Sequence, residues 1–284
     1  MNGIGPEILL SILSNNEFPE SCAPIVYASH EDLENTKKDL SMNCELLLIN
    51  SSSELEDSAI NVLDIDARGA TINYGKKDKA IGKLAYYCLE QAVRDLNEGN
   101  IDVLVTAPIN KETIQSKNFS FMGHTDYLNE NIEGSSVMMM VSNSLRVALL
   151  TEHLSLSRVA KSITKELVES RTKSIQKTLQ LDFNISHPKI AMLSIDPHAG
   201  DNGVIGTIDN VVLAPCISSM KTEGMLIDGP FPADSFFGSM KYKEFDVVVA
   251  PYHDQGLIPF KTLSFGRGVN FTSGLKYVRT SPDH

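Results

Sequence analysis

The sequence predicts an α/β fold in which strands alternate with helices around a mainly parallel sheet. Two observations support this prediction. Short apolar runs bounded by turn residues, such as Ile101–Thr106 and Val247–Ala250, are typical of buried strands. Between such runs, Lys79–Asn97 has apolar residues at helical spacing. This alternation is the pattern of strand–helix–strand units, whose strands lie parallel in one sheet.

The first half of the chain supplies strands and helices in turn. Pro6 and Glu7 open an apolar stretch with the chemistry of an ordinary capped helix, although the glycines before them could also hold an anion. Ser29 opens a second helix, in which His30 is expected to be a solvated residue. The strands expected here are Ala23–Ala28, Cys44–Asn50 and Ile60–Asp64.

The second half begins with a hairpin, because two apolar runs flank a short polar turn at Ser142. A long helical stretch then precedes a strand, and an acidic loop follows before Val247–Ala250. These segments are Val137–Val141 and Leu145–Leu150 for the hairpin, Ser157–Leu181 for the helix, Lys189–Ile195 for the strand and Ile227–Asp234 for the loop.

Size and composition exclude several classes of protein. With 284 residues and a mass of 31.2 kDa, the chain has the length of roughly two domains. A net charge of -11 disfavours nonspecific binding to nucleic acid, which depends on a cationic surface. The apolar runs are shorter than the ~18 residues of a membrane span and no signal peptide is visible, so we expect a cytoplasmic protein. The cysteines are far apart, as expected of reduced core thiols rather than disulfides; they are Cys22, Cys44, Cys88 and Cys216.

Three of the seven histidines share one sequence context. His153, His198 and His253 each follow an apolar strand and stand in a polar loop. Because the carboxyl ends of parallel strands meet at one edge of a sheet, the three imidazoles can converge there. Three protein ligands with an open position form the site of a catalytic divalent metal. Any one of these histidines alone is more often a structural residue, and an ordinary strand with a polar loop has the same pattern.

Other polar residues also follow strands. Asp254 lies beside His253, and Gly256 is expected to let the same loop turn. Lys111 follows Ile101–Thr106, although Asn110 beside it could equally cap a helix.

Two further groups of residues suit a polar ligand. His124 and Thr125 follow the flexible Gly123, where Thr125 could equally be a helix N-cap. A basic C-terminal stretch suits a phosphate or a carboxylate, but a solvated basic face has the same composition. Its members are Lys261, Arg267, Asn270, Thr272, Lys276 and Arg279.

Six short motifs run in order along the chain. They are Thr106-Ala-Pro-Ile-Asn-Lys, Gly123-His-Thr-Asp, Asp196-Pro-His-Ala-Gly-Asp, Gly229-Pro-Phe-Pro-Ala-Asp234, Tyr252-His-Asp-Gln-Gly-Leu and Gly268-Val-Asn-Phe-Thr. Together they resemble the 4-hydroxythreonine-4-phosphate dehydrogenase family of pyridoxal phosphate (vitamin B6) biosynthesis, and the resemblance covers the whole chain.

The resemblance implies a fold like that of the isocitrate and isopropylmalate dehydrogenases, with two α/β domains and a cleft between them. It assigns residues 1–112 plus 255–284 to the first domain and 113–254 to a second domain with dimer contacts. It also implies a homodimer with the active site at its interface. The implied reaction is NAD-dependent oxidation of 4-phosphooxy-L-threonine to 2-amino-3-oxo-4-phosphooxybutanoate, followed by decarboxylation to 3-amino-2-oxopropyl phosphate.

The resemblance also implies roles for single residues. His153, His198 and His253 match the family's metal ligands, for which imidazoles favour zinc or cobalt although magnesium is also allowed. Asp234, Asp254 and Lys111 are candidates for proton transfer or support of the metal. The family's substrate-binding residues fall on His124, Thr125, Lys261, Asn270 and Arg279. Cofactor-binding residues stay unassigned, because the family pattern continues beyond Ser281-Pro-Asp-His with a segment that this sequence lacks.

Two other functions remain open on the sequence. A paralogue of the same family could oxidise another phosphorylated hydroxy acid, such as threonate or erythronate 4-phosphate, or a dihydrodiol, since a few contacts decide that choice. A protein of a different class could bind a metal and a phosphorylated ligand without catalysis.

Overall fold

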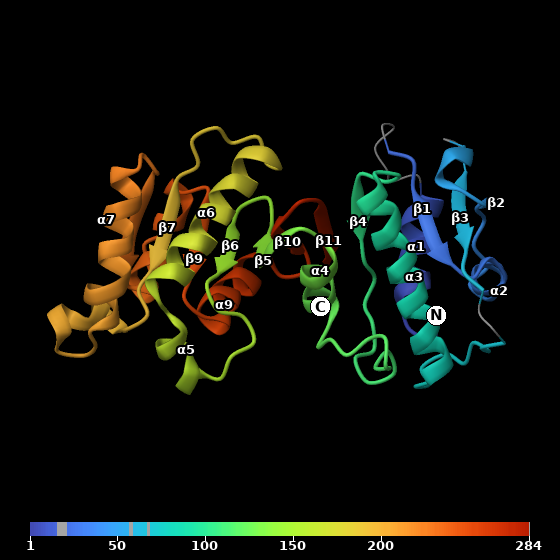
Figure 1. Cartoon of the computed structure of the whole chain (residues 1–284), viewed down its shortest axis with the longest axis horizontal. Helices are drawn as coiled ribbons and strands as arrows, with labels where there is room; N and C mark the ends of the chain where they lie inside the picture. Colours follow the sequence, from blue (N-terminus) through green and yellow to red (C-terminus); the bar gives the residue numbers. More distant parts are fainter. Residues whose placement is uncertain (16–21, 57–58, 67–68, 284) are drawn as a thin grey trace. The chain divides into compact units, whose positions relative to one another are not determined.

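The computed structural model describes residues 1–15, 22–56, 59–66 and 69–283, and it contains two compact units, Met1–Glu133 and Gly134–His284. Each unit combines strands with helices, which confirms the α/β class (Figure 1). No helix among the described residues is both long and apolar enough to cross a lipid bilayer.

The first unit is built on a small parallel sheet. Its strands lie in the order β1 (Ile25–Ala28), β3 (Ile60–Asp64) and β2 (Leu46–Ile49), close to the three strands predicted. The other elements of this unit are α1 (Gly5–Ser14), α2 (His30–Asp39), η1 (Ser52–Glu54), α3 (Lys79–Glu98), β4 (Val103–Val105) and α4 (His124–Asn131). The core between sheet and helices contains Leu13, Val26, Ala28, Leu33, Ile60 and Val62.

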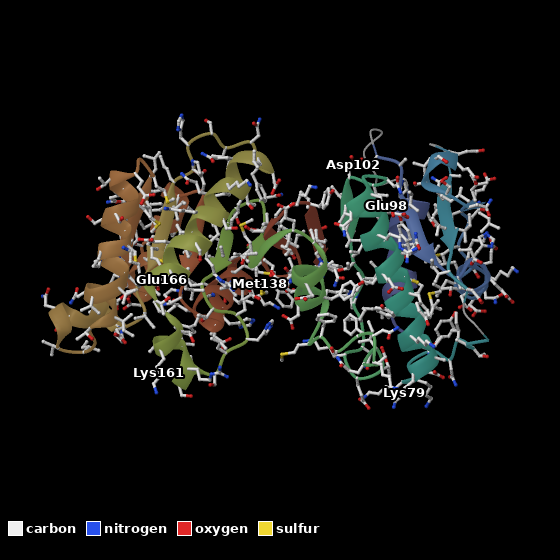
Figure 2. All side chains as sticks on the ribbon, in the orientation of Figure 1. Lys79, Glu98, Asp102, Met138, Lys161 and Glu166 are labelled. Carbon is white, nitrogen blue, oxygen red and sulfur yellow. The ribbon has the colours of Figure 1, made fainter. Side chains whose placement is uncertain are left out.

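Local chemistry explains where these helices begin and end. Pro6 stands in the first turn of α1, where its missing N–H costs nothing. The Ser29 hydroxyl accepts the N–H of Asp32 at 3.3 Å and so caps α2, as predicted. Helix α3 ends at Gly99, whose φ of 77° suits glycine; Figure 2 shows Lys79 and Glu98 at its two ends.

Two expectations for the first unit were wrong in detail. His30 begins α2, but its Nε2 atom is buried and has no hydrogen-bond partner in the described part of the chain, so the ring is not simply solvated. Strand β4 was expected to be buried, yet Val103 is 53% and Val105 70% exposed, because only the face bearing Leu104 is covered.

The second unit is built on a larger, mixed sheet. Its strands lie in the order β11-β10-β5-β6-β9-β7-β8. From β6 to β8 the pairing is parallel, whereas β11, β10, β5 and β6 pair antiparallel. The bounds are β5 Gly134–Val141, β6 Arg146–Leu149, β7 Ile190–Leu193, β8 Ile227–Phe231, β9 Val247–Ala250, β10 Val269–Leu275 and β11 Val278–Pro282. The predicted hairpin is confirmed as β5 and β6, and only half of this sheet is parallel.

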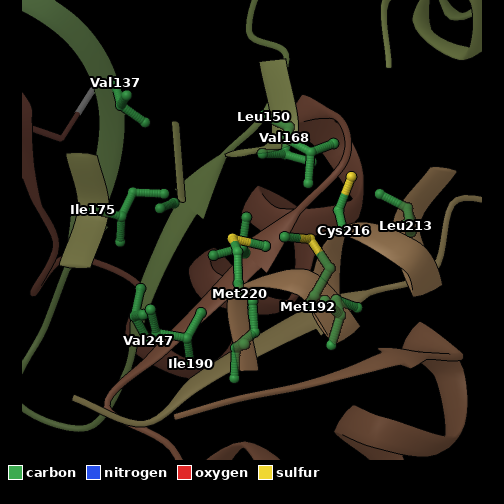
Figure 3. Packing of buried hydrophobic residues seen from close by; sticks show 14 of the residues in the cluster. Val137, Leu150, Val168, Ile175, Ile190, Met192, Leu213, Cys216, Met220 and Val247 are labelled. Carbon is green, nitrogen blue, oxygen red and sulfur yellow. The ribbon is translucent and has the colours of Figure 1, made fainter. Parts of the chain in front are cut away.

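Helices cover both faces of this sheet. They are α5 (Leu156–Ser162), α6 (Lys165–Leu181), α7 (Ala214–Thr222), α8 (Ala233–Gly238) and α9 (His253–Ser264), with short turns η2 (Pro197–Gly203), η3 (Asp209–Leu213) and η4 (Lys241–Glu244). On one face Val247 and Ile190 pack with Ile175 of α6 and Met220 of α7 (Figure 3). On the other face, Val248 and Ala250 pack with Leu257 and Phe260 of α9 and with Phe236 of α8. Successive residues of β9 therefore pack into the cores on opposite faces of the sheet.

Several segments differ from their expected structure. The single helix Ser157–Leu181 is two helices, because Thr164 leaves the helical conformation and its hydroxyl caps α6 by accepting the N–H of Leu167. The acidic loop Ile227–Asp234 is mostly strand β8, and the segment from His253 onward is helix α9 rather than a loop. Gly256 lies within α9 and not at a turn: a Cβ there would lie 2.7 Å from Val147 Cγ1, so glycine allows the helix to approach the sheet.

Residues 255–284 contain the end of α9 and the strands β10 and β11. Strand β10 pairs with β5 and with β11, and α9 packs on β6 and β9. These contacts connect the stretch to strands of the second unit, and the expected domains, residues 1–112 plus 255–284 and residues 113–254, stay a prediction.

Candidate active site

The three strands that precede the predicted histidines lie next to one another. In the sheet, β9 lies between β6 and β7, and it runs parallel to both, with Val147 opposite Val248 and Met192 opposite Val249. Their carboxyl ends therefore share one edge, as the sequence predicted. His153 follows β6, His253 follows β9 and His198 follows β7.

Two of these histidines lie side by side. The ring centroids of His153 and His253 are 5.6 Å apart, with an angle of 41° between the ring planes. Both rings border a hollow of about 190 Å³ whose other lining residues are Glu152, Leu154, Leu156, Tyr252 and Asp254. The hollow is small and open to solvent, since His153 and Asp254 are exposed.

Hydrogen bonds beyond the end of β6 join the two segments that carry these rings. The N–H of Leu150 donates to the carbonyl of Ala250 at 2.9 Å, and the N–H of Thr151 donates to the carbonyl of Pro251 at 3.1 Å. The buried Thr151 hydroxyl donates to the same carbonyl at 2.7 Å. The parallel pairing thus continues for two residues beyond β6, which fixes the start of both histidine segments.

Glu152 adds a second restraint on the segment that carries His153. Its Oε1 accepts a hydrogen bond from Arg171 of α6 at 2.9 Å and one from the N–H of Met138 of β5 at 3.1 Å. The Oε1 atom of Glu152 therefore connects this segment to α6 and to β5. It lines the hollow mainly as a support for its neighbour His153.

The orientation of His253 is set by the residue that follows it. Its Nδ1 lies 2.8 Å from Asp254 Oδ1. With the proton on Nδ1 as donor to this carboxylate, the lone pair of Nε2 stays available to a metal ion. A carboxylate behind an imidazole is the arrangement that orients histidine ligands in metal sites.

The segment that carries His198 has an unusual backbone. His198, Ala199, Asp201 and Asn202 all have positive φ, between 43° and 54°, and Gly200 has φ of 76°. The left-handed conformation costs roughly 1–2 kcal/mol for each residue that is not glycine. Such strain persists only where the surrounding structure fixes it, and it is common at functional sites.

These positions allow a test of whether the residues fit a divalent metal. His153 and His253 supply two adjacent imidazoles, one of them backed by a carboxylate, and this donor set suits zinc or cobalt. Among the described residues, however, no group of three or more His, Cys, Asp or Glu side chains is already arranged around a metal position. Two ligands therefore fit, and the part of His198 stays a prediction.

Three residues of the basic C-terminal stretch lie on the paired strands β10 and β11. Asn270 and Thr272 of β10 lie opposite Ser281 and Arg279 of β11, so all four side chains share one face. Arg279 is 3% exposed and donates from Nη1 to Thr272 Oγ1 at 3.1 Å. Burial lowers the pKa of its guanidinium to about 10.

Other members of the basic stretch lie apart from that face or at the surface. Lys261 of α9 forms an ion pair with Asp283 at 2.9 Å, close to the end of β11. Arg267 and Lys276 are exposed. Asp234 is exposed in the first turn of α8, and its role in proton transfer or metal support stays a prediction.

The remaining candidates belong to the first unit. His124 is the first residue of α4, and its N-cap is Gly123, so Thr125 is a first-turn residue and not the cap. The Lys111 side chain runs past this helix start, since a Cβ at Gly123 would lie 3.8 Å from Lys111 Cε. Asn110 accepts the N–H groups of Glu112 and Thr113 and caps a turn. Lys111 and His124 therefore lie on neighbouring segments.

A larger hollow of about 590 Å³ also lies in the first unit, but it does not suit a phosphate. Its lining includes Glu31, Asp32, Asp39, Asp64 and Asp66, and no lysine or arginine among the described residues. An anionic ligand would be repelled there.

Sequence reasoning missed the residues that support the histidines. Thr151, Glu152, Gln255 and Asp209 make the hydrogen bonds that fix the three histidine segments. For Thr151, Glu152 and Gln255 the available signal was their position, since each is a polar residue within a few residues of a strand end, whereas Asp209 stands 16 residues after β7 and had no such signal. Their partners lie on other segments of the chain, which a sequence does not reveal.

Comparison with known proteins adds the family. Residues 20–284 match the family described as pyridoxal phosphate biosynthetic protein PdxA. A 4-hydroxythreonine-4-phosphate dehydrogenase of Bacteroides thetaiotaomicron is 41% identical over 286 residues, covering 100% of this chain and 79% of that protein. A relative from Oceanobacillus iheyensis with the provisional name D-threonate 4-phosphate dehydrogenase is 37% identical, covering 99% of this chain and 86% of its own length.

A solved structure agrees with these relatives. The crystal structure of 4-hydroxythreonine-4-phosphate dehydrogenase from Klebsiella pneumoniae has a TM-score of 0.87 at 31% identity, covering 100% of this chain and 86% of that chain. Family match, sequence identity and fold all point the same way. The chain therefore belongs to the pyridoxal phosphate biosynthetic protein PdxA family.

Proposed function

We propose that this chain is a dehydrogenase that oxidises 4-phosphooxy-L-threonine to 2-amino-3-oxo-4-phosphooxybutanoate with NAD, and that decarboxylation then gives 3-amino-2-oxopropyl phosphate. Membership of the family and the name of the Bacteroides relative support the substrate and the reaction. The protein acts in pyridoxal phosphate biosynthesis as a cytoplasmic homodimer, with its active site completed by the partner subunit.

The observation that carries this proposal is the pairing of His153 with His253 at the edge of the parallel strands. Their ring centroids are 5.6 Å apart, and Nδ1 of His253 lies 2.8 Å from Asp254 Oδ1. With His198 they would hold a divalent metal: zinc, cobalt or magnesium. Such an ion acts as a Lewis acid that lowers the pKa of a bound hydroxyl and stabilises an adjacent enolate.

The chain's own residues bind and orient the substrate. Arg279 and Asn270, on one face of β10 and β11, and Lys261 provide the donors that a phosphate or a carboxylate requires. Burial of Arg279 strengthens such an interaction, because the guanidinium is already removed from water. His124 and Thr125 at the start of α4 orient the substrate, and Lys111, Asp234 and Asp254 are the candidates for proton transfer.

The name of one relative indicates a second substrate to compare with 4-phosphooxy-L-threonine. The Oceanobacillus protein, provisionally named D-threonate 4-phosphate dehydrogenase, is 37% identical over nearly the whole chain. Its substrate differs from 4-phosphooxy-L-threonine by a hydroxyl in place of the amine. A few polar contacts decide between such ligands, and a buried donor or acceptor left unpaired costs a large factor in rate.

The test is to measure NADH formation by absorbance on both substrates and on erythronate 4-phosphate, with metal content measured on the same preparation. His253→Ala is compared with His187→Ala, which removes an exposed histidine of the same unit just before the amino end of β7, the end opposite to the site. We expect His253→Ala to lose metal and to lower turnover at least ~10–100-fold, the scale seen when a residue that supports a metal site is removed. His187→Ala should retain both.

Different outcomes would reject different parts of the proposal. Unchanged metal content and turnover in His253→Ala would reject the histidine site. Faster NADH formation on threonate 4-phosphate than on 4-phosphooxy-L-threonine would show that threonate 4-phosphate is the substrate. Metal and phospholigand binding without any NADH formation would instead indicate a binding protein without catalysis.

A further inference from the structure

We propose that Gln255 and Asp209 are positioning residues that fix the loop carrying His198 relative to the helix that begins with His253. The loop meant here is residues 194–203, and its base is Ser194, Ile195 and Asp196. The inference deepens the proposed function and depends on it, because the loop is held for the sake of a metal ligand.

The base of the loop is held by a buried carboxylate. Asp209 is fully buried, and its two oxygens accept the N–H groups of Ile195 at 2.9 Å and Asp196 at 3.0 Å. It stands at the start of η3, on the far side of the loop in sequence. Both oxygens of a buried carboxylate are thus used on backbone groups directly before the strained residues.

Ser194, the remaining residue of the base, is held by a side chain of α9. The Nε2 group of Gln255 donates to the carbonyl of Ser194 at 2.6 Å. Gln255 belongs to the first turn of α9, two residues after His253. This single hydrogen bond connects the helix that carries one histidine to the base of the loop that carries another.

Backbone hydrogen bonds at the tip of the loop join residues of the same turn. Within its tip, the N–H of Val204 donates to Asp201 and the N–H of Ile205 to Gly200, both at 3.1 Å. These bonds close turns but do not attach the tip to the sheet. A run of positive φ at His198, Ala199, Asp201 and Asn202 needs external restraint to persist. Asp209 and Gln255 supply such restraint at the loop's base, together with the N–H of Ser194, which donates to the carbonyl of Phe231 of β8 at 2.8 Å.

The amide of Gln255 is only partly paired among the described residues. The Oε1 atom of Gln255 is buried and has no hydrogen-bond partner in the described part of the chain. Leaving an amide oxygen unpaired is unfavourable, so packing alone does not explain a glutamine at this position. The hydrogen bond from Nε2 to the loop is what distinguishes glutamine from an apolar residue of the same length.

The experiment uses the full chain with two variants and two matched controls. Gln255→Met removes the amide and keeps the length, and its control is Gln180→Met, whose Nε2 donates to the carbonyl of Ser186 at 3.2 Å elsewhere in the unit. Asp209→Asn weakens the carboxylate contacts, and its control is Asp246→Asn, whose carboxylate accepts the N–H of Lys189 at 2.8 Å at the other end of β7.

Two measurements are made on each protein: the affinity for Co²⁺ by calorimetric titration, and the rate of hydrogen exchange of the amides from 195 to 206. We expect each of the two variants to weaken Co²⁺ binding ~10-fold, as for other residues that support a metal ligand, and to speed exchange in the loop. Each control should bind Co²⁺ as the unmodified chain does. Circular dichroism shows whether all four variants are folded.

The outcomes separate this inference from the proposed function. If the unmodified chain binds no Co²⁺, the metal site of the proposed function fails, while the exchange rates still report on the loop. If it binds Co²⁺ and both variants match their controls in affinity and exchange, the positioning role is overturned. A variant that does not fold leaves the other variant and its control to decide.

Discussion

The hydroxyl of Thr151 donates a hydrogen bond of 2.7 Å to the carbonyl of Pro251, and this contact joins the segments that carry His153 and His253. Thr151→Val keeps the shape and removes the donor. A buried hydrogen bond contributes about 0.5–1.5 kcal/mol, so we expect a loss of that size in the free energy of unfolding, measured by urea denaturation.

The control for this variant is Thr262→Val. The Thr262 hydroxyl donates to the carbonyl of Ile258 at 2.8 Å, but it is exposed on α9. Water replaces an exposed partner, so a change of less than ~0.5 kcal/mol is expected. Equal losses in both variants would mean that the link between the two segments adds nothing beyond an ordinary hydroxyl contact.

The ion pair of Glu152 with Arg171 should contribute more than a surface pair. The two side chains are 16% and 22% exposed, and Glu152 also accepts the N–H of Met138. Arg171→Met is expected to cost about 1–2 kcal/mol, between the values for surface pairs and for hydrogen bonds to charged groups. Thermal unfolding measures the loss.

Lys173→Met on the same helix is the matched comparison. Lys173 pairs with Glu223 at 2.7 Å, but both side chains are about half exposed. Solvent screening limits such a pair to less than ~1 kcal/mol. If Lys173→Met destabilised the chain as much as Arg171→Met, the partial burial of Glu152 would have no energetic effect.

The pairing of His153 with His253 could be predicted because its causes are local and regular. Each histidine follows a short apolar strand, and the crossover that separates such strands makes them parallel, so their carboxyl ends meet. The position of the His198 loop could not be predicted in the same way. Its path depends on a run of left-handed residues that Asp209 and Gln255 hold from outside the loop.

Helix α9 was missed for a different physical reason. Pro259 lies inside it, and proline and glycine are ordinary signals for a loop. Here Gly256 allows close packing on the sheet, and Leu257 and Phe260 on either side of Pro259 pack in the core. The strands β10 and β11 were missed as well, since their residues mix polar and apolar types and their pairing with β5 is long-range.

Asp32 should make the stability of the chain depend on pH. It is 8% exposed, and burial raises the pKa of its carboxyl. The folded chain therefore binds its proton more tightly than the unfolded chain, so stability falls as the pH rises from the ordinary Asp value of ~3.9 through the raised value. Asp32→Asn removes this cost and should be the more stable protein at pH 7.

The advantage of Asp32→Asn should shrink as the pH is lowered below ~4, where the carboxyl is protonated in both states. Urea denaturation at a series of pH values measures it. Glu31→Gln removes an exposed charge from the same turn of α2 and should change stability by less than ~0.5 kcal/mol. A constant difference between Asp32→Asn and the unmodified chain at every pH would contradict the assignment to this carboxyl.

Gly256 links the packing of α9 to the position of His253, three residues earlier in the same helix. A Cβ at this position would lie 2.7 Å from Val147 Cγ1 and 3.0 Å from both Ala250 Cβ and Leu149 Cδ2. All three atoms belong to residues of β6 and β9, whose backbone cannot move without disturbing the sheet. Gly256→Ala should therefore cost about 1–3 kcal/mol, the usual range for overpacking a core.

The same variant should also affect the site, because α9 can relieve the contact only by moving away from β6 and β9, and His253 moves with it. We expect weaker Co²⁺ binding together with the lower stability. Gly238→Ala, at the end of α8, places its Cβ where no described atom lies within 4 Å and should leave both quantities unchanged. Loss of stability in Gly256→Ala with unaltered Co²⁺ affinity would show that the helix absorbs the strain without moving His253.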